Sequence, residues 1–418
     1  MKKLFPLIFC ILLISKVQAQ YGLSNAKNLA MGFACSPFAR GAESAFFNPA
    51  HLAKQEKNIE ILVLGVGAII RNNSFTLQQY NQYSGTYLND NDKQDILASI
   101  SDNAKSESQI EAQVLAICYK SVTFSTSLNG GLFGDLSKDL FDISLFGNRQ
   151  DQNYSFNPGN GELSSFIKTG ISYGISLPWK NDFISHVSSG ISLKYLYGHY
   201  YYKVLASKIN TLTTFNQTYA NGSVEMQKAK GGSGYAIDLG FAAETVTGWR
   251  FSLNAFNLFN NMKWNSDCEK LFYDFTLQDD DIDTWLAGDA DFDSTFVTSD
   301  TSISIPSFNT RLPVILRFGT GYTIGKMNLA AEWIQSFKES AYSNKQPVIA
   351  LGGEFSASNI FKIRAGLNYT GPFGMNYSTG LGVDLNSISW NIAIATTNGI
   401  TPESAKGLAL ATHITMVF

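Results

Sequence analysis

The sequence predicts an all-β fold: a 14-stranded antiparallel transmembrane β-barrel with an N-terminal hatch in its lumen and long extracellular loops. Three observations support this prediction. The last eleven residues alternate apolar and polar up to a terminal Phe, the chain begins with an export signal, and the segments between them alternate with the period of two that a barrel wall requires.

The C-terminal segment, residues 408–418, is typical of the closing strand of an outer-membrane barrel. We expect His413 to face the lumen, and the strand to pair with residues 60–70 so that the barrel closes. The side chains expected to face lipid are Leu408, Leu410, Ile414 and Phe418.

The N-terminus has the pattern of a secretory signal. Lys2 and Lys3 precede an apolar run over residues 4–14, and small residues reach the expected cleavage site after Ala19, so residues 1–19 are predicted to be a signal peptide. Lipoprotein processing at Cys10 is an alternative, but the bulky Phe9 before it does not favour lipidation.

Composition excludes several classes. Beyond the signal, no segment approaches the roughly 18 consecutive apolar residues of a spanning helix, and a net charge of −3 leaves no basic stripe for nucleic acid. Aromatic residues make up 13% of the chain, as expected for strands with Tyr and Trp at bilayer interfaces. Three cysteines remain after the signal; Cys35 and Cys268 could pair, but spacing leaves this open.

Fourteen segments with strand periodicity follow the signal, and the gaps between them are alternately short and long. If Phe418 is periplasmic, all four of the long gaps, residues 73–109, 129–164, 205–232 and 258–312, lie outside. A missed hairpin is conceivable within residues 272–305. The predicted strands are residues 57–72, 110–119, 121–128, 165–177, 187–204, 233–246, 249–257, 313–324, 326–336, 346–356, 360–370, 375–384, 387–396 and 407–418.

The charged residues of these segments share the less apolar face, where the lumen would be. We interpret them mainly as structural ion pairs, because both signs are present and buried charges must be paired or hydrated. Glycines recur on the same face and leave room for an occupant such as a plug. The main lumen-facing charges are Arg250, Arg317, Glu332, Glu354, Lys362, Arg364 and Asp384.

The segment before the first strand is the candidate plug. It ends in Phe47, Asn48, Pro49 and Ala50, and the run from Met31 to Leu52, placed between a signal and a barrel, resembles the N-terminal hatch of the FadL family of hydrophobe transporters. His51 stands where that family usually has Gly. The resemblance implies a hatch over residues 20–55 and a barrel over residues 56–418.

A second resemblance lies further along the chain. Residues 131–133, 136–140, 145–148 and 188–198 look like an uncharacterised family of Bacteroidota outer-membrane β-barrel proteins, a domain of unknown function. Relatives with the hatch motif include fatty-acid-type transporters and, more distantly, the PorV-like barrels of type IX secretion. The resemblance therefore implies a location in the outer membrane of a Gram-negative bacterium, but it does not define the function.

Nothing in the sequence favours an enzyme or a cofactor. The four His residues have no spacing for a metal pair or a Ser-His-Asp set. Asp289, Asp291 and Asp293 have the spacing of a calcium loop, with Asp300 in the position of the last ligand, but the sharp-turn Gly is missing. We interpret this stretch as a solvated acidic loop and keep calcium as a weak alternative.

Two functions fit the sequence. One is a FadL-like passive transporter of a hydrophobic or amphipathic small molecule, which the hatch motif and the inward glycines favour. The other is a non-transporting scaffold barrel that binds a protein partner in secretion or in surface-lipoprotein assembly, which the large outer gaps favour. Residues 141–146 are apolar enough to form a short amphipathic lid in an outer gap.

Overall fold

The structure is a computed structural model that describes residues 22–55, 59–147, 149–156, 161–214, 218–278, 296–338, 340, 343 and 345–418. The predicted signal peptide and the calcium candidates Asp289, Asp291 and Asp293 lie outside these residues. Among the described residues, no helix is long and apolar enough to cross a membrane.

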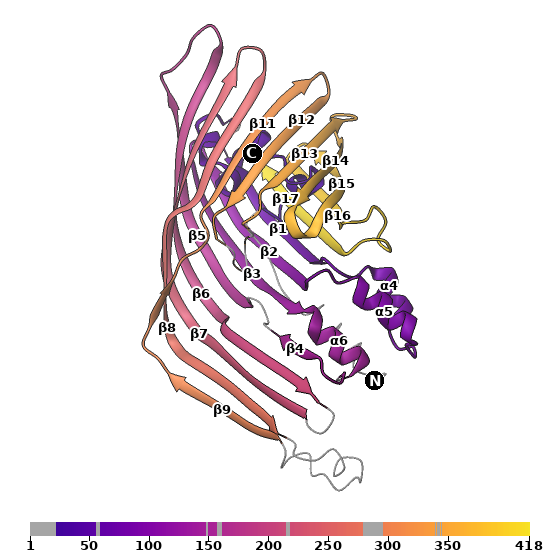
Figure 1. Cartoon of the computed structure of the whole chain (residues 1–418). Helices are drawn as coiled ribbons and strands as arrows, with labels where there is room; N and C mark the ends of the chain where they lie inside the picture. Colours follow the sequence, from indigo (N-terminus) through magenta and orange to yellow (C-terminus); the bar gives the residue numbers. More distant parts are fainter. Residues whose placement is uncertain are drawn as a thin grey trace.

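The described strands form a single sheet of 17 strands that closes on itself as an antiparallel barrel (Figure 1). Three of them, β4 (Asn153–Phe156), β9 (Phe296–Ser304) and β10 (Phe308–Thr310), only extend the sheet, so fourteen form the wall, as predicted. The wall strands are β1 (Ile59–Asn72), β2 (Asn103–Tyr119), β3 (Val122–Ser137), β5 (Glu162–Leu177), β6 (Ile184–Thr213), β7 (Thr218–Thr245), β8 (Trp249–Gln278), β11 (Ile315–Ile324), β12 (Met327–Ser336), β13 (Val348–Ser356), β14 (Phe361–Thr370), β15 (Gly374–Leu385), β16 (Ile388–Thr397) and β17 (Gly407–Val417).

The barrel closes between its first and last strands, which confirms the prediction for the C-terminal segment. β17 pairs with β1 in antiparallel register, with Leu410 opposite Ala68 and Val417 opposite Glu60. Leu410 and Phe418 are 58% and 66% exposed on the outer face, whereas His413 is 3% exposed on the inner face. The alternation of this strand therefore separates an apolar outside from a polar inside.

The outer gaps are shorter than predicted, because five strands, β2, β3, β6, β7 and β8, run well past the expected ends. β6 and β8 have 30 residues each and β7 has 28, although about 9–11 residues cross a bilayer. Residues 205–232 are thus mostly strand, and residues 258–312 contain the end of β8 together with β9 and β10. The extensions are rich in Ser, Thr, Asn and Lys and lack the continuous apolar face of a lipid-facing strand, so the apolar alternation disappears while the hydrogen-bond ladder continues. Figure 1 shows these strands as an arm that leaves the barrel at its lower end.

Three short helices lie beside the outer end of the barrel: α4 (Leu77–Tyr83), α5 (Asp90–Ala98) and α6 (Lys138–Phe146). Thr76 and Asn89 cap the first two, each accepting a hydrogen bond from a backbone N–H of the first helical turn. Phe75, Ile96 and Phe141 form their common core. The proposed lid segment is therefore helical, and it packs on this cluster and on β4.

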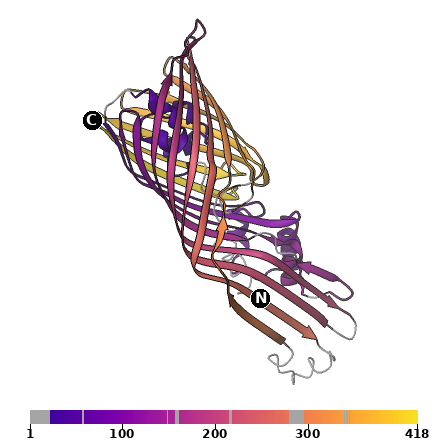
Figure 2. The same cartoon turned by 90° about the vertical axis from the view of Figure 1, so that its left-hand side faces the viewer.

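The N-terminal segment lies inside the barrel (Figure 2). It is built from short helical turns separated by extended residues, and Leu29, Met31, Phe47 and Leu52 are fully buried. We call residues 22–55 the plug. Its elements are α2 (Ala26–Ala30), η1 (Ser36–Phe38), η2 (Gly41–Glu43), α3 (Ser44–Phe47) and η3 (Pro49–Ala53).

Candidate functional site: the plugged lumen

Glycines on the inner face of the wall allow the plug backbone to touch the strands. A Cβ on Gly352 would overlap the carbonyl oxygen of Met31, and one on Gly366 would overlap the backbone nitrogen of Gly32. A Cβ on Gly174 would lie 2.7 Å from the Pro49 carbonyl oxygen. The room left by these glycines is thus taken by the main chain of the plug. The other predicted inward glycines that face the plug are Gly319, Gly321 and Gly380, whereas Gly382 faces wall side chains.

Asn48 anchors the motif that resembles the hatch. Its Oδ1 accepts a hydrogen bond from the Ala50 N–H (2.9 Å) and thereby caps η3, with Pro49 at the first position of that turn. Its Nδ2 donates to the Phe241 carbonyl (2.9 Å) and to Ser252 Oγ (2.8 Å) on the wall. One side chain therefore orders the plug turn and attaches it to β7 and β8.

Arg317 and Glu332 form a buried ion pair that also holds the plug. Their side chains are 2% and 0% exposed. Arg317 Nη2 donates to Asn28 Oδ1 (2.9 Å) and to the Phe33 carbonyl (2.7 Å), while Glu332 Oε1 accepts from the Ser36 N–H (2.5 Å). Because both charges are fully buried, these plug groups complete a solvation shell that water cannot supply.

The remaining predicted lumen charges are also paired. Arg364 donates to Glu354 (2.7 Å), and Lys362 lies 2.6 Å from Asp384. Arg250 is the weakest case, at 4.0 Å from Glu244, and its guanidinium lies 5.1 Å from the centre of the Phe38 ring of the plug. Each of these pairs joins opposite charges on neighbouring strands of the wall.

Phe47, the first residue of the predicted motif, packs against the guanidinium group of Arg317 in the wall. Its side chain is fully buried, and the Arg317 guanidinium lies 5.1 Å from the centre of its ring. Ala50 is fully buried as well, and its backbone lies against Gly190 of β6. All four motif residues thus lie at the plug–wall contact.

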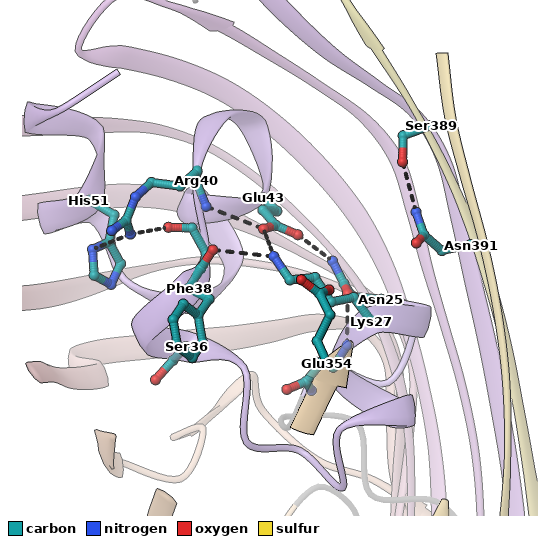
Figure 3. A network of polar contacts seen from close by, with 12 residues as sticks. Asn25, Lys27, Ser36, Phe38, Arg40, Glu43, His51, Glu354, Ser389 and Asn391 are labelled. Atoms are coloured by element: carbon teal, nitrogen blue, oxygen red, sulfur yellow. Dashed lines mark hydrogen bonds and ion pairs between the residues drawn. The ribbon is translucent and has the colours of Figure 1, made fainter. Parts of the chain in front are cut away.

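A charged network inside the plug was missed by the sequence analysis (Figure 3). Lys27 Nζ lies 3.0 Å from Glu43 Oε1, Asn25 Nδ2 donates to Glu43 Oε2 (3.0 Å), and Arg40 continues the network to Glu244 on the wall (2.8 Å). Burial alone would raise the pKa of the Glu43 carboxyl, but the Lys27 ammonium and the hydrogen bonds to it outweigh burial and lower that pKa. Opposite charges spaced along a Gly- and Ala-rich segment were the available signal.

Two wall residues accept hydrogen bonds from the start of the plug. Glu111 Oε2 accepts from the Leu23 N–H (2.8 Å), and His413 Nδ1 accepts from the Ala26 N–H (2.9 Å). The alternation of the predicted strand placed His413 inside; Glu111 shared that signal on its own strand but was not selected. Glu111 thus pairs an N–H of the extended segment before α2, and His413 pairs the N–H of the first residue of α2, which has no partner within the helix.

Small cavities follow one another along β5 on the outer side of the plug. One, of about 20 Å³, is lined by Phe166, Tyr201, Trp264 and their neighbours. The next, of about 40 Å³, lies against Gly22 and Phe46 of the plug and is lined by Glu111 and Lys168. At about 10–15 Å³ per water molecule, the first has room for one or two waters and the second for about three or four, so a solute passes only if side chains or the plug move.

The wall has an irregular seam where β8 leaves β11 for β10. Backbone pairing stops at Phe256 and resumes at Met262. Between these points, side chains replace the ladder: Asn260 Nδ2 donates to the Leu312 carbonyl (3.1 Å), and Asn260 Oδ1 accepts from the Leu312 N–H (2.7 Å). Side-chain hydrogen bonds thus replace backbone–backbone hydrogen bonds in this stretch of the wall.

The cysteines and the candidate metal ligands of the sequence analysis form no disulfide and no metal-binding cluster among the described residues. Cys35 and Cys268 are both buried and free, the first in the plug and the second near the outer end of β8, so the disulfide that the sequence left open is absent from the structure. Burial raises the pKa of the Cys35 thiol. No group of metal-ligating side chains occurs among the described residues, and Asp300 lies in strand β9.

Comparison with known proteins agrees with this description of the fold. The model of a family of unknown function, DUF5723, matches residues 49–229. The toluene transporter TodX of Pseudomonas putida is 13% identical, with a TM-score of 0.53 over 95% of this chain and 99% of that chain. A TodX monoaromatic hydrocarbon channel mutant is 11% identical, with a TM-score of 0.52 over 95% of this chain and 100% of that chain.

A FadL homologue of Pseudomonas aeruginosa is 12% identical, with a TM-score of 0.47 over 94% of this chain and 98% of that chain. No curated protein matches the sequence. The chain thus shares the fold of TodX, a closed antiparallel barrel, and at these identities the similarity concerns the fold alone.

Proposed function

We propose that this protein is an outer-membrane channel for a hydrophobic or amphipathic small molecule and that the plug is its gate. The observation that carries the proposal is the combination of an aromatic-lined outer cavity with a plug that fills the lumen behind it. An apolar solute would enter at Phe166, Tyr201 and Trp264, where rings offer contact area and Lys338 and Arg311 offer polar contacts at the rim.

The exit follows from the same geometry. Every described contact between plug and wall is non-covalent, so the plug can rearrange, and the side-chain-closed seam at Asn260 offers a second route sideways through the wall. The similarity to the fold of TodX, which is described as a toluene transporter, supports this class of solute without identifying it.

Flux into liposomes tests the proposal. Protein lacking residues 22–55 should admit a monoaromatic or fatty-acid-sized solute faster than the full chain. If neither protein raises flux above that of empty liposomes for a panel of apolar, amphipathic and polar solutes, the channel function is wrong. Native mass spectrometry after mild extraction should also find a lipid-like ligand.

One observation favours a second candidate, a scaffold barrel. The arm formed by the ends of β6, β7 and β8 with β9 extends far beyond the length needed to cross a bilayer. A pore alone does not require a sheet that extends this far beyond the bilayer. A protein that remains bound to the purified barrel in a fixed ratio, with no solute flux, would favour this function.

A further inference from the structure

The arm differs from the barrel in having free edges. Its strands lie in the order β4, β6, β7, β8 and β9 (Figure 1). In the barrel each strand has two neighbours, but the two outermost strands of the arm have one each among the described residues. An exposed strand edge is a template for another strand unless it is protected.

The β4 edge is protected in two ways. The strand is only four residues long, and α6 packs against it. In addition, the Ser155 N–H donates to Asp139 Oδ2 of α6 (3.1 Å). A short strand whose backbone is already paired to a helix offers little to a partner.

The β9 edge has no such protection within the described part of the chain. The strand is nine residues long and pairs with β8 without a register shift. The Ile305 N–H donates to the Cys268 carbonyl of β8 (2.9 Å). Because N–H and C=O groups alternate in direction along a strand, those of Asp300, Ser302 and Ser304 point away from β8. Residues 299–304 are all exposed.

The sequence of β9 also lacks the features that usually prevent an edge strand from pairing with another chain. It contains no Pro, no Lys and no bulge, and Ser, Thr and Val make up most of it. Asp300, at its centre, is its only charge. Two copies paired antiparallel about this centre would place Asp300 opposite Asp300, which is unfavourable. The edge therefore suits a foreign strand better than a second copy.

We propose that the β9 edge binds an extended segment of another protein, which adds to the arm as a sixth strand with a Lys or Arg opposite Asp300. Main-chain hydrogen bonds to Asp300, Ser302 and Ser304 would supply affinity, and the Asp300 carboxylate would set register and preference. This inference goes beyond channel function, since it concerns a surface outside the lumen and holds whether or not the barrel conducts.

The test compares Ser302→Pro with Ser302→Ala in the full-length protein in detergent. Both lose the side-chain hydrogen bond from Ser302 to Glu269, but only proline removes the outward N–H, and neither touches the pairing with β8. The probe is a fluorescent nine-residue peptide of alternating Thr and Val with Lys at its centre, and a second peptide has Glu there. Heat-modifiable gel migration verifies that each variant retains the folded barrel.

We expect the Lys peptide to bind the alanine variant about fivefold more tightly than the Glu peptide, and about tenfold more tightly than it binds the proline variant. Asp300→Lys should reverse the preference between the peptides. Equal binding by both Ser302 variants, or no binding to either one at millimolar peptide, would overturn the proposal. A homodimer of the alanine variant that the proline variant fails to form would instead assign the edge to a second copy.

Discussion

The contact between plug and wall can be tested at two adjacent glycines of β13. Gly352 faces the lumen, where an added Cβ would overlap the Met31 carbonyl oxygen and lie 2.7 Å from Met31 Cβ. Gly353 faces outward, where a Cβ would lie 3.5 Å from Leu329 Cδ2, an ordinary contact. Gly352→Ala and Gly353→Ala thus add the same methyl group to the same strand, one against the plug and one away from it.

The expected effect follows from the space available. The added Cβ would lie 2.3 Å from the Met31 carbonyl oxygen, so Met31 must move by about 1.1 Å to restore a contact of 3.4 Å, and the Ser378 hydroxyl that donates to the Ala30 carbonyl (3.1 Å) resists the shift. Overpacking of this kind costs about 1–3 kcal/mol. If this free energy destabilises the docked plug relative to the undocked plug, the ratio of undocked to docked plug rises by roughly 5- to 150-fold.

Two assays should report the change. Protease cleavage within residues 22–55 should accelerate in Gly352→Ala, and flux of a small solute into liposomes should rise, while Gly353→Ala behaves like the parent protein. Combining Gly352→Ala with deletion of the plug should give the flux of the deletion alone. Indistinguishable proteolysis and flux in the two single variants would refute the claim that this glycine positions the plug.

Three further variants test other contacts. Arg317→Met leaves Glu332 buried without its partner and should lower the free energy of unfolding by about 3–5 kcal/mol in urea titrations. Asn260→Ala should raise the flux of apolar solutes through the seam, whereas Asn261→Ala, which loses one exposed contact of 3.4 Å, should not. Burial, aided by the nearby Arg40, holds the pKa of His51 well below its usual 6.5, so plug docking should weaken as pH falls below about 6.5, and His51→Gln should remove that part of the dependence.

The fold could be predicted because lipid imposes the same sorting on every wall strand. All fourteen segments were found from period-two alternation, and the pairing of the last strand with the first followed from the need to close the barrel. The strand ends could not be found in the same way. In residues 205–232 Ser, Thr, Asn, Gln, Lys and Gly predominate, so the composition resembles a loop although β6 and β7 continue in register.

The site was predictable to a lesser degree. Alternation placed Arg317 and Glu332 on one face, but their contacts with the plug depend on how a segment of short turns folds inside the lumen. The inward-facing glycines could be found from the alternation of the strands, but the plug backbone that packs against them could not be predicted. Glu111 lay on the inner face by the same alternation, and Lys27 and Glu43 were visible as opposite charges in the plug segment, but the sequence does not say which plug atoms these side chains reach.

The plug contacts the wall closely on opposite sides of the lumen and borders a cavity, and this bears on how a gate could open. On the side of β13 and β14, Gly352 and Gly366 bring wall and plug backbones into contact, so displacement there must break close packing and expose buried N–H groups. Beside β5 and β6 the plug backbone also lies close to the wall, at Gly174 and Gly190, but next to these contacts is a cavity lined by Phe46 and Lys168. A passage that widens this cavity costs less than one that expels the whole plug, because the close backbone contacts on both sides remain in place. The structure therefore favours local rearrangement beside Phe46 over removal of the plug as a unit.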